Sequence, residues 1–408
     1  MAVAMMTTIV LSAVPAGAEG GSASAHPAPA TGTSRTTASG HIPVWAADFM
    51  AGAVSVTRER AVRQARHFDM IVALKGTYAK YVSDMRAANP DLTLLVYLNG
   101  VMAQANEGSK YPDSWYATDA QGNRVKSLGF GNYLMKPNHP GWVNDVADRC
   151  TSFLKESGYD GCFLDVLGTA PLNAWYVTSP PINQRTGSPW SEGAWLAATG
   201  HISAATRAAA GRAPVYGNGL SDGSRYFAQV PSSTLLKNLD GGMAESFVRD
   251  ATAPVQDFRL HDAWAADVRM LVDVAQRDAD TLAITKVWTT ATARQRTAIQ
   301  RYALGTFLLG YEPGHGYFSF RDDHGLTRYH PVWSVNLGDP IGAAHRVGGA
   351  FVRRFENGVV VVNPTAVRIN VGLGSQGRKT LGRAFGGRAR FDSNVSVRPH
   401  SASILTND

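Results

Sequence analysis

Two acidic residues each end a short apolar run of the sequence. Asp165 follows Phe163 and Leu164 in GYDGCFLDV, and Glu245 ends GGMAE. An unpaired buried charge costs on the order of several kcal/mol, so packing alone does not account for a carboxylate at either place. Two carboxyl groups facing each other across a cleft can hydrolyse a glycosidic bond, because one attacks or directs water while the other protonates the leaving oxygen. These two residues are our candidate catalytic pair.

The two carboxyl groups have different expected roles. We expect Asp165 to act as nucleophile or base. The neighbours of Glu245 in GGMAESF are mostly apolar, and an apolar setting raises a carboxyl pKa toward neutrality, which suits a general acid/base. Structural alternatives stay open: Asp165 as a helix N-cap or the partner of Lys75, and Glu245 in a salt bridge with Arg249 or a lysine at the rim. Asp160 we interpret as part of the turn into the strand that Asp165 ends, at the opposite end of that strand.

Polar and aromatic residues near the ends of other apolar runs would surround these carboxyl groups. Preorganised hydrogen-bond donors stabilise charge that develops in a transition state, and aromatic rings pack against the apolar faces of sugar rings. Long loops after the third and fourth runs also hold aromatic residues, whose alternative role is to anchor those loops. The candidate substrate-binding residues are Lys75, Tyr97, Asn99, Trp175, Asn218, Lys286 and Trp288.

Metal and serine-nucleophile chemistry finds little support in the sequence. His261, His315 and His324 are scattered without the H-E-x-x-H or C-x-x-C spacing of a zinc site. The single G-x-S-x-G match, Gly219-Leu220-Ser221-Asp222-Gly223, is a short motif that does not by itself mark a serine hydrolase. We therefore expect neither a metal nor a cofactor.

Short β-rich runs alternate with amphipathic helical stretches between residues 41 and 330. This alternation is typical of a parallel sheet covered by helices, and eight such units fit a (β/α)₈ barrel. Active groups in that barrel lie at the carboxyl ends of the strands. A doubly wound sheet, the alternative, would usually show a glycine-rich phosphate turn after an early strand. The expected strands are Ile42–Trp45, Met70–Leu74, Thr93–Leu98, Cys162–Val166, Pro214–Tyr216, Gly242–Glu245, Leu282–Trp288 and Tyr317–Phe320.

Residues 331–408 lose the helical periodicity. Within them, FVRRFENGVVVVNP predicts two strands joined at Glu356-Asn357-Gly358, because Asn-Gly is a strong hairpin signal. Further short β-rich runs follow, so we expect a small β-sandwich-like domain after the barrel. Polysaccharide-degrading enzymes often have this arrangement, although a fold alone does not identify a function.

The first 40 residues resemble an export signal followed by a tether. Residues 1–18 are apolar and end in Ala16-Gly17-Ala18, an A-x-A cleavage pattern. Residues 19–40 are almost all Gly, Ser, Ala, Thr and Pro, and cannot bury enough apolar surface to fold. A short membrane anchor is the alternative to a signal peptide. We expect a secreted protein, and no later stretch reaches the roughly 18 apolar residues that a membrane span needs.

The charge of the chain limits the classes of binding partner that we expect. The 408 residues include 39 basic and 32 acidic ones, for a net charge of +7. Because the cations form no run longer than Arg353–Arg354, we favour a soluble basic protein over a binder of nucleic acid or another polyanion. We expect a monomer whose partner is a carbohydrate.

Cys150 falls on an expected helix and Cys162 on the next strand, and since packed helix and sheet axes lie roughly 10 Å apart, we favour two buried thiols over one bridge.

Several blocks of the sequence resemble one bacterial family. Similarity to hypothetical glycosyl hydrolase family 15, a group distinct from the glucoamylases of similar number, is carried by SWYATDAQGNRV, MKPNHPGWVNDVADRC through GYDGCFLDV, YGNGL, GGMAESF and LGDPIGAAHRVGGAFVRRFENGVVVVNP. The G-[YF]-D-G-x-F-L-D block also resembles the α-galactosaminidase-like barrel families, in which the final Asp is the catalytic residue of the fourth strand. The resemblance covers roughly residues 41–400. It implies a barrel with a C-terminal β-domain, secreted carbohydrate hydrolysis, and Asp165 and Glu245 as the matching carboxylates.

The sequence thus predicts a secreted glycoside hydrolase that acts on a polysaccharide or oligosaccharide. One rival hypothesis is a carbohydrate-binding barrel without catalysis. The separation of the two carboxyl groups discriminates between them: about 5 Å indicates retention, roughly 6.5–9.5 Å indicates inversion, and a much larger distance argues for binding only. The second rival, a polyanion-binding protein, would lose affinity steeply as salt increases.

Overall fold

The computed structural model describes most of the chain after its first 39 residues. The described residues are 40–51, 54–373, 378–380, 391–392 and 394–406. The expected signal peptide, residues 1–18, and all but the last residue of the expected tether, residues 19–40, lie outside the described residues.

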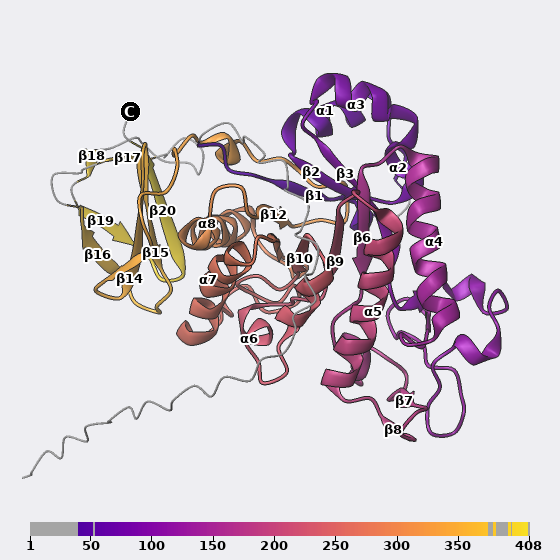
Figure 1. The fold of residues 1–408 in the computed structure, drawn as a ribbon. Helices are drawn as coiled ribbons and strands as arrows, with labels where there is room; N and C mark the ends of the chain where they lie inside the picture. The colour runs from indigo at the N-terminus through magenta and orange to yellow at the C-terminus, as the bar shows by residue number, and fades with distance from the viewer. Residues whose placement is uncertain (1–39, 52–53, 374–377, 381–390, 393, 407–408) are drawn as a thin grey trace, which may run out of the picture. The chain divides into compact units, whose positions relative to one another are not determined.

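Eight parallel strands form one sheet, in the order β1-β2-β3-β6-β9-β10-β11-β12 (Figure 1). A parallel bridge between Val44 and Phe318 joins β12 to the segment just before β1, so the sheet closes on itself. The predicted (β/α)₈ barrel is therefore confirmed, and each of the eight expected runs contributes one strand. The strands are β1 (Trp45–Ala47), β2 (Met70–Ala73), β3 (Thr93–Asn99), β6 (Gly161–Asp165), β9 (Val215–Asn218), β10 (Gly241–Ala244), β11 (Asp280–Lys286) and β12 (Tyr317–Arg321).

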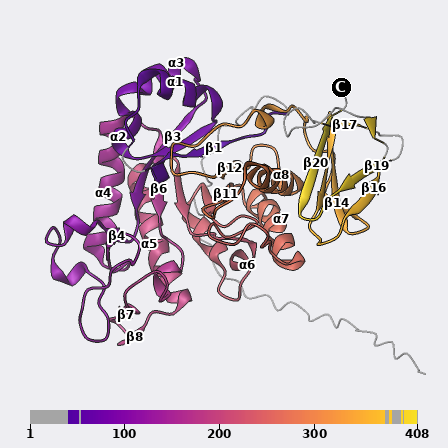
Figure 2. The same cartoon turned by 180° about the vertical axis from the view of Figure 1, so that it is seen from behind.

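Helices surround the barrel sheet in both views of the molecule (Figures 1 and 2). Helix α4 shows why they begin and end where they do: Pro140 occupies its first turn, His139 Nδ1 accepts from the Gly141 N–H, and Gly158 stops it with a φ of +70°. None of the helices in the described ranges combines the length and apolar character needed to cross a bilayer. The helices are α1 (Arg58–His67), α2 (Lys75–Tyr78), α3 (Val82–Ala88), α4 (Pro140–Ser157), α5 (Glu192–Ala210), α6 (Gly223–Tyr226), α7 (His261–Gln276) and α8 (Ala293–Gly310).

The interior of the barrel is filled by residues that alternate along the strands. Positions two apart on a strand point to the same face. Phe163, Tyr216, Met243 and Ile284 all belong to the buried interior cluster. The residue two positions after each of these also points inward, and it lies at the carboxyl end of the barrel, where it is polar. Those polar residues are Asp165, Asn218, Glu245 and Lys286.

Two long insertions follow β3 and β6, at the carboxyl ends of the barrel strands. In the first, β4 (Met102–Ala103) pairs antiparallel with β5 (Tyr133–Leu134). In the second, β7 (Ile182–Asn183) pairs antiparallel with β8 (Ser188–Pro189). An antiparallel bridge between Ser127 and Val177 connects the two insertions, so they support one another above the barrel sheet.

The C-terminal region forms antiparallel sheets, as predicted. A six-stranded sheet has the order β13-β14-β15-β20-β17-β18, and β16 pairs with β19 separately. The expected hairpin is confirmed, because Phe355 pairs with Gly358 across a two-residue turn between β14 and β15. Helix α8 packs closely on this region: a Cβ on its Gly305 would lie 2.4 Å from Ala402 Cβ. The strands are β13 (His345–Val347), β14 (Ala350–Phe355), β15 (Gly358–Asn363), β16 (Ile369–Gly372), β17 (Arg378–Thr380), β18 (Phe391–Asp392), β19 (Asn394–Val397) and β20 (Ser401–Thr406).

Cys150 on α4 and Cys162 on β6 form a disulfide. The expectation of two buried thiols is therefore wrong. The separation of roughly 10 Å that motivated it holds between the axes of a helix and a sheet. These two Cα atoms face each other across that gap and lie only 6.0 Å apart, within the reach of a bridge.

Candidate active site

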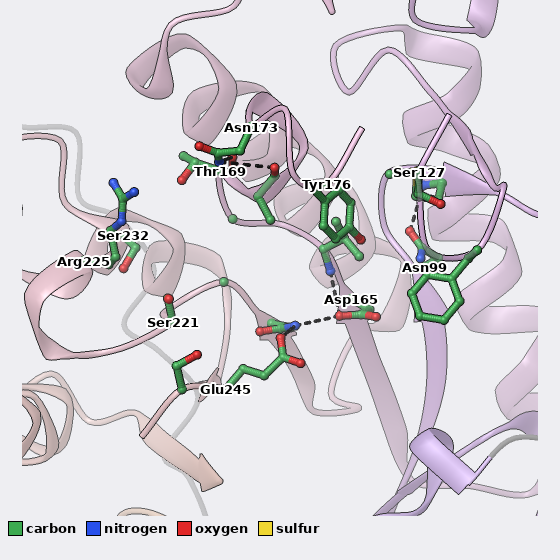
Figure 3. A pocket seen from close by; sticks show the side chains of 18 of the residues that line it. Asn99, Ser127, Asp165, Thr169, Asn173, Tyr176, Ser221, Arg225, Ser232 and Glu245 are labelled. Carbon is green, nitrogen blue, oxygen red and sulfur yellow. Dashed lines mark hydrogen bonds between the residues drawn. The ribbon is translucent and has the colours of Figure 1, made fainter. Parts of the chain in front are cut away.

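A cavity of about 630 Å³ opens at the carboxyl ends of the barrel strands (Figure 3). Its volume is typical of small-ligand sites, and its position is where (β/α)₈ barrels carry their active groups. Both candidate catalytic residues, Asp165 and Glu245, line it. So do six of the seven expected substrate-binding residues: Tyr97, Asn99, Trp175, Asn218, Lys286 and Trp288.

Lys75 does not line the cavity, so the prediction that it binds substrate is wrong. The inward phase of β2 is that of Met70 and Val72, which places Lys75 on the outward phase at the start of α2. Its Nζ donates a 2.6 Å hydrogen bond to Glu156 Oε2 on α4. The alternative in which Lys75 pairs with Asp165 is excluded by the same contact.

Three neutral donors hold the Asp165 carboxylate. Tyr97 donates its hydroxyl to Oδ2 at 2.7 Å, and the Asn218 amide donates to Oδ1 at 2.8 Å. The Val166 N–H also donates to Oδ1, at 2.9 Å. Asp165 is not a helix N-cap, since Thr169 occupies that place before the next helical turn, η5 (Ala170–Leu172). Hydrogen bonds on both oxygens therefore fix this carboxylate where it faces the cavity.

Removal from bulk water and the nearby charge of Glu245 raise the pKa of Asp165. The hydrogen bonds from Asn218, Tyr97 and Val166 act in the opposite direction but do not cancel these effects. Burial and the charge of Asp165 also raise the pKa of Tyr97 well above its ordinary value, so Tyr97 keeps the proton that it donates.

Glu245 has a charged partner. Lys286 Nζ lies 2.5 Å from Glu245 Oε1, so the structure realises the alternative of a salt bridge with a lysine at the rim. Arg249, the other partner considered, instead donates to backbone oxygens in its own loop. Burial raises the pKa of Glu245, but the Lys286 charge and the hydrogen bonds from Lys286 and Asn218 outweigh burial, and the pKa is lowered. The expectation of an apolar setting that raises this pKa is wrong.

The side-chain amide of Asn218 links the two carboxyl groups. Its Nδ2 donates to Asp165 Oδ1 and to Glu245 Oε2, at 2.8 Å in each case. Both hydrogens of the amide are thus used by the carboxylates rather than offered to a sugar hydroxyl, which changes the role expected for Asn218. Because both oxygens lie 2.8 Å from one nitrogen, they are at most twice that distance apart. This separation is below the range of roughly 6.5–9.5 Å that leaves room for an attacking water between two carboxyl groups.

Stacked aromatic pairs form parts of the cavity wall. Trp288 stacks on His324 with ring centroids 4.5 Å apart, and Phe49 stacks on Tyr97 at 4.8 Å. Such flat apolar faces suit the axial C–H faces of sugar rings. In the part of the chain that the structure describes, no group of three or more His, Cys, Asp or Glu side chains could hold a metal ion.

Other cavity residues were not identified as site residues from the sequence. They include Phe49 after β1, Arg225 on α6 and His324 after β12. Tyr176, one of the aromatic residues expected in the loop after the fourth run, also lines the cavity, and burial and the two carboxylates raise its pKa. Phe49 lies two residues after β1 and His324 three residues after β12, so a search for aromatic as well as polar residues after each strand would have found them. Arg225 follows no apolar run and carries no comparable signal.

The backbone just beyond the catalytic strands adopts unusual conformations. Val166 follows Asp165 directly with a φ of +61°, Ser221 follows β9 with +64°, and Val248 follows β10 with +59°. A left-handed conformation is rare for residues other than glycine and costly for β-branched valine. Among the described residues, three of the five non-glycine residues with a positive φ thus lie within three positions after Asp165, Asn218 or Glu245.

Comparison with known proteins points to carbohydrate-active enzymes. The family model described as hypothetical glycosyl hydrolase family 15 matches residues 86–359. A search of curated proteins found no match. Among solved structures, a GH31 dextranase of Flavobacterium johnsoniae in complex with glucose is similar with a TM-score of 0.50 and 11% identity, over 90% of this chain and 51% of that one. At this identity the likeness shows the fold alone.

Two further solved structures cover most of their own length in the comparison. The glycoside hydrolase domain of PelA from Pseudomonas aeruginosa has a TM-score of 0.45 and 14% identity, over 73% of this chain and 96% of that one. A maltogenic α-amylase from Thermotoga neapolitana has a TM-score of 0.48 and 10% identity, over 90% of this chain and 98% of that one.

Proposed function

The chain belongs to hypothetical glycosyl hydrolase family 15, and we propose that it cleaves O-glycosidic bonds of a polysaccharide or oligosaccharide with Asp165 and Glu245 as its two catalytic carboxyl groups. The observation that carries this proposal is their juxtaposition: one Asn218 amide joins both carboxylates in the wall of the cavity. A pair of carboxyl groups at this distance is the apparatus that glycoside hydrolysis needs.

The short separation supports hydrolysis with retention of anomeric configuration. In that mechanism a carboxylate attacks the anomeric carbon directly, so the two groups lie about 5–5.5 Å apart and no water stands between them. Asp165 Oδ1 and Glu245 Oε2 each lie 2.8 Å from the shared donor, Asn218 Nδ2, so their separation is compatible with this short distance.

Asp165 acts as the nucleophile in this proposal, and Glu245 as the acid/base. An Asp165 oxygen bonds to the anomeric carbon while the glycosidic C–O bond breaks and the leaving oxygen takes the Glu245 proton. Glu245 then removes a proton from a water molecule, whose oxygen attacks the same carbon and releases Asp165. The three neutral donors on Asp165 support its role, because they fix an attacking carboxylate without neutralising it.

Lys286 pairs directly with Glu245. By pairing with Glu245 it favours the ionised form, which is the form that the water-activation step uses. The first step needs the protonated form instead, so Lys286 limits the pH range in which Glu245 can donate its proton.

Digestion of a glycan panel tests the proposal. The wild-type protein should release products from at least one glycan, while Glu245→Gln should slow turnover on the order of 10²–10⁴-fold and Asp165→Asn by at least as much. Thermal unfolding and circular dichroism serve as controls for folding. Wild-type rates for both variants on a confirmed substrate would disprove the assignment.

The second candidate is a carbohydrate-binding protein that does not catalyse hydrolysis. The Lys286–Glu245 ion pair favours it, because a carboxylate held at 2.5 Å by a lysine is a poor proton donor. The same glycan panel separates the two functions: this candidate predicts saturable binding of a glycan with no product from it, even after prolonged incubation.

We also propose that the protein acts outside the cell, because residues 1–18 have the apolar composition and the A-x-A end of a signal peptide. Mass spectrometry of the culture medium should find a mature chain that begins after Ala18. An uncleaved chain found only inside the cells would contradict export.

A further inference from the structure

Two aromatic side chains at the rim of the cavity are largely exposed to solvent. Phe130 is 75% exposed and Trp175 is 69% exposed, and both line the cavity that holds the carboxyl pair. They are the two most exposed aromatic side chains among the residues that the structure describes. Large apolar side chains grouped on a surface often mark a binding site.

The loops that carry these two residues are tied together by their backbones. The Leu128 N–H donates to the Tyr176 oxygen and the Thr178 N–H donates to the Lys126 oxygen, both at 2.9 Å. The bridge between Ser127 and Val177 lies between these two hydrogen bonds. Phe130 and Trp175 are thus presented by one connected piece of structure, although they come from separate insertions.

A backbone turn supports Phe130, and a ring contact supports Trp175. The Gly131 N–H donates to the Ser127 oxygen at 2.9 Å, and Gly131 has a φ of +67°, which closes a tight turn with Phe130 inside it. Trp175 is packed edge-on against Tyr176 with ring centroids 5.6 Å apart. The backbone at Phe130 is therefore fixed and the Trp175 ring already has a packing partner before any ligand arrives, which lowers the entropic cost of binding.

The cavity has polar side chains on both sides of the carboxyl pair. In Figure 3, Arg225 and Ser232 lie to one side of Asp165 and Glu245, and Asn99 and Ser127 lie to the other. Ser127 belongs to the loop that carries Phe130. A chain that runs across the carboxyl pair would therefore reach the exposed rings as it leaves the cavity.

We propose that Phe130 and Trp175 form a distal subsite that binds sugar units of a polysaccharide several units away from the bond being cut. This inference rests on the proposed function and names its substrate class: a chain cleaved at internal bonds, not a small glycoside cleaved at its end. The apolar faces of pyranose rings stack on exposed aromatic rings, while the hydroxyl groups stay in water. Continuity of the two rings with the cavity argues for a segment of the same glycan as their occupant.

Kinetics on substrates of different length test the subsite. Phe130→Ala and Trp175→Ala should each raise KM for the polysaccharide about three- to tenfold, the size expected for one aromatic stacking contact. The double variant should lose more. On an oligosaccharide that spans only the carboxyl pair, the rise in KM should be smaller than on the polysaccharide for all three variants, because a short substrate has less contact with the two rings.

Phe227→Ala is the matched control. Phe227 is 45% exposed but does not line the cavity, so its loss should change neither substrate. An equal change on short and long substrates for the rim variants, or no change on either, would overturn the subsite while leaving the proposed function intact. Binding of a protein by the rim, with polysaccharide kinetics unchanged, would overturn it as well. Unaltered turnover by Asp165→Asn would refute the proposed function instead.

Discussion

Two aspartates at opposite ends of β6 differ in almost every property that matters for catalysis. Asp160, before the strand, accepts a 2.8 Å hydrogen bond from the Leu94 backbone N–H and pairs with Arg86 at the surface. Asp165, at the other end, accepts from two neutral side chains and its own neighbour, and faces a cavity. The carboxylate of Asp160, in the expected turn, thus connects β6 to β3 through a hydrogen bond. The carboxylate of Asp165 instead faces the cavity, where a ligand can reach it.

The amino ends of other strands repeat the pattern of Asp160. Asp69 accepts from the Val44 N–H at 2.7 Å and Asp240 from the Val215 N–H at 2.6 Å, and each also has a cationic or histidine partner. Carboxylates at this end therefore satisfy backbone groups of a neighbouring strand. The comparison teaches that the partners of a carboxylate, more than its burial, separate a structural acid from a catalytic one.

Removing the carboxylate at one end of β6 or at the other should produce the largest difference in kcat/KM. Asp165→Asn is expected to reduce kcat/KM by orders of magnitude, whereas Asp160→Ala should leave it within about twofold, because Asp160 contacts no part of the cavity. Steady-state kinetics on one confirmed substrate would measure both. A large loss of activity in a folded Asp160→Ala protein would mean that the two ends are not functionally separate.

The pH dependence of activity should reflect the pKa values of the two catalytic groups, which are shifted in opposite directions. The raised pKa of Asp165 means that the nucleophile is lost by protonation at a higher pH than for an ordinary aspartate, which sets the acid limb. The lowered pKa of Glu245 means that the proton donor is lost at a lower pH than usual, which sets the alkaline limb. The profile of kcat/KM should therefore be narrow and centred in acid.

Lys286→Met should shift one limb of this profile. Without the lysine, burial is left to raise the pKa of Glu245, so the alkaline limb should move to higher pH. Measuring kcat/KM across pH for both proteins checks this. Movement of the acid limb instead would mean that Glu245 is the nucleophile and Asp165 the proton donor.

The smallest expected effect concerns stability. Asp160→Ala leaves the Leu94 N–H without its side-chain acceptor, so we expect a loss of about 1–3 kcal/mol in the free energy of unfolding. Asp165→Asn should leave the melting temperature unchanged or raise it, because a raised pKa means that the ionised group destabilises the folded state at neutral pH. Denaturant titrations of both variants would show it. A marked destabilisation by Asp165→Asn would argue that this residue is structural.

The barrel and most of the site could be predicted because of one simple relation. Each strand is an apolar run, and a polar residue in the inward phase at its carboxyl end must face the mouth, as Asp165, Asn218 and Glu245 do. The relation failed for Lys75 because the apolar run extends past the end of β2. The residue that ends this run is therefore already in α2, and its side chain faces outward.

Contacts between strands could not be predicted from the sequence. The Lys286–Glu245 pair depends on the register of β10 against β11, in which Met243 lies opposite Leu282. Asp48 follows β1 and is polar, yet it is buried and accepts from the Tyr78 hydroxyl at 2.6 Å and the Thr327 N–H at 2.7 Å, outside the cavity. Asp48 has the outward phase of β1, whose inward residues are Trp45 and Ala47, so only the phase, and not the position after a strand, distinguishes it from Asp165.

The most direct test is to trap the covalent intermediate. Activated 2-deoxy-2-fluoroglycosides slow both steps but the second more, so a retaining enzyme accumulates its glycosyl ester. Mass spectrometry of the digested protein should then find one added sugar on the peptide that contains Asp165, and none in Asp165→Asn. A sugar attached to Glu245, or continued release of inverted product with no adduct at all, would contradict the account.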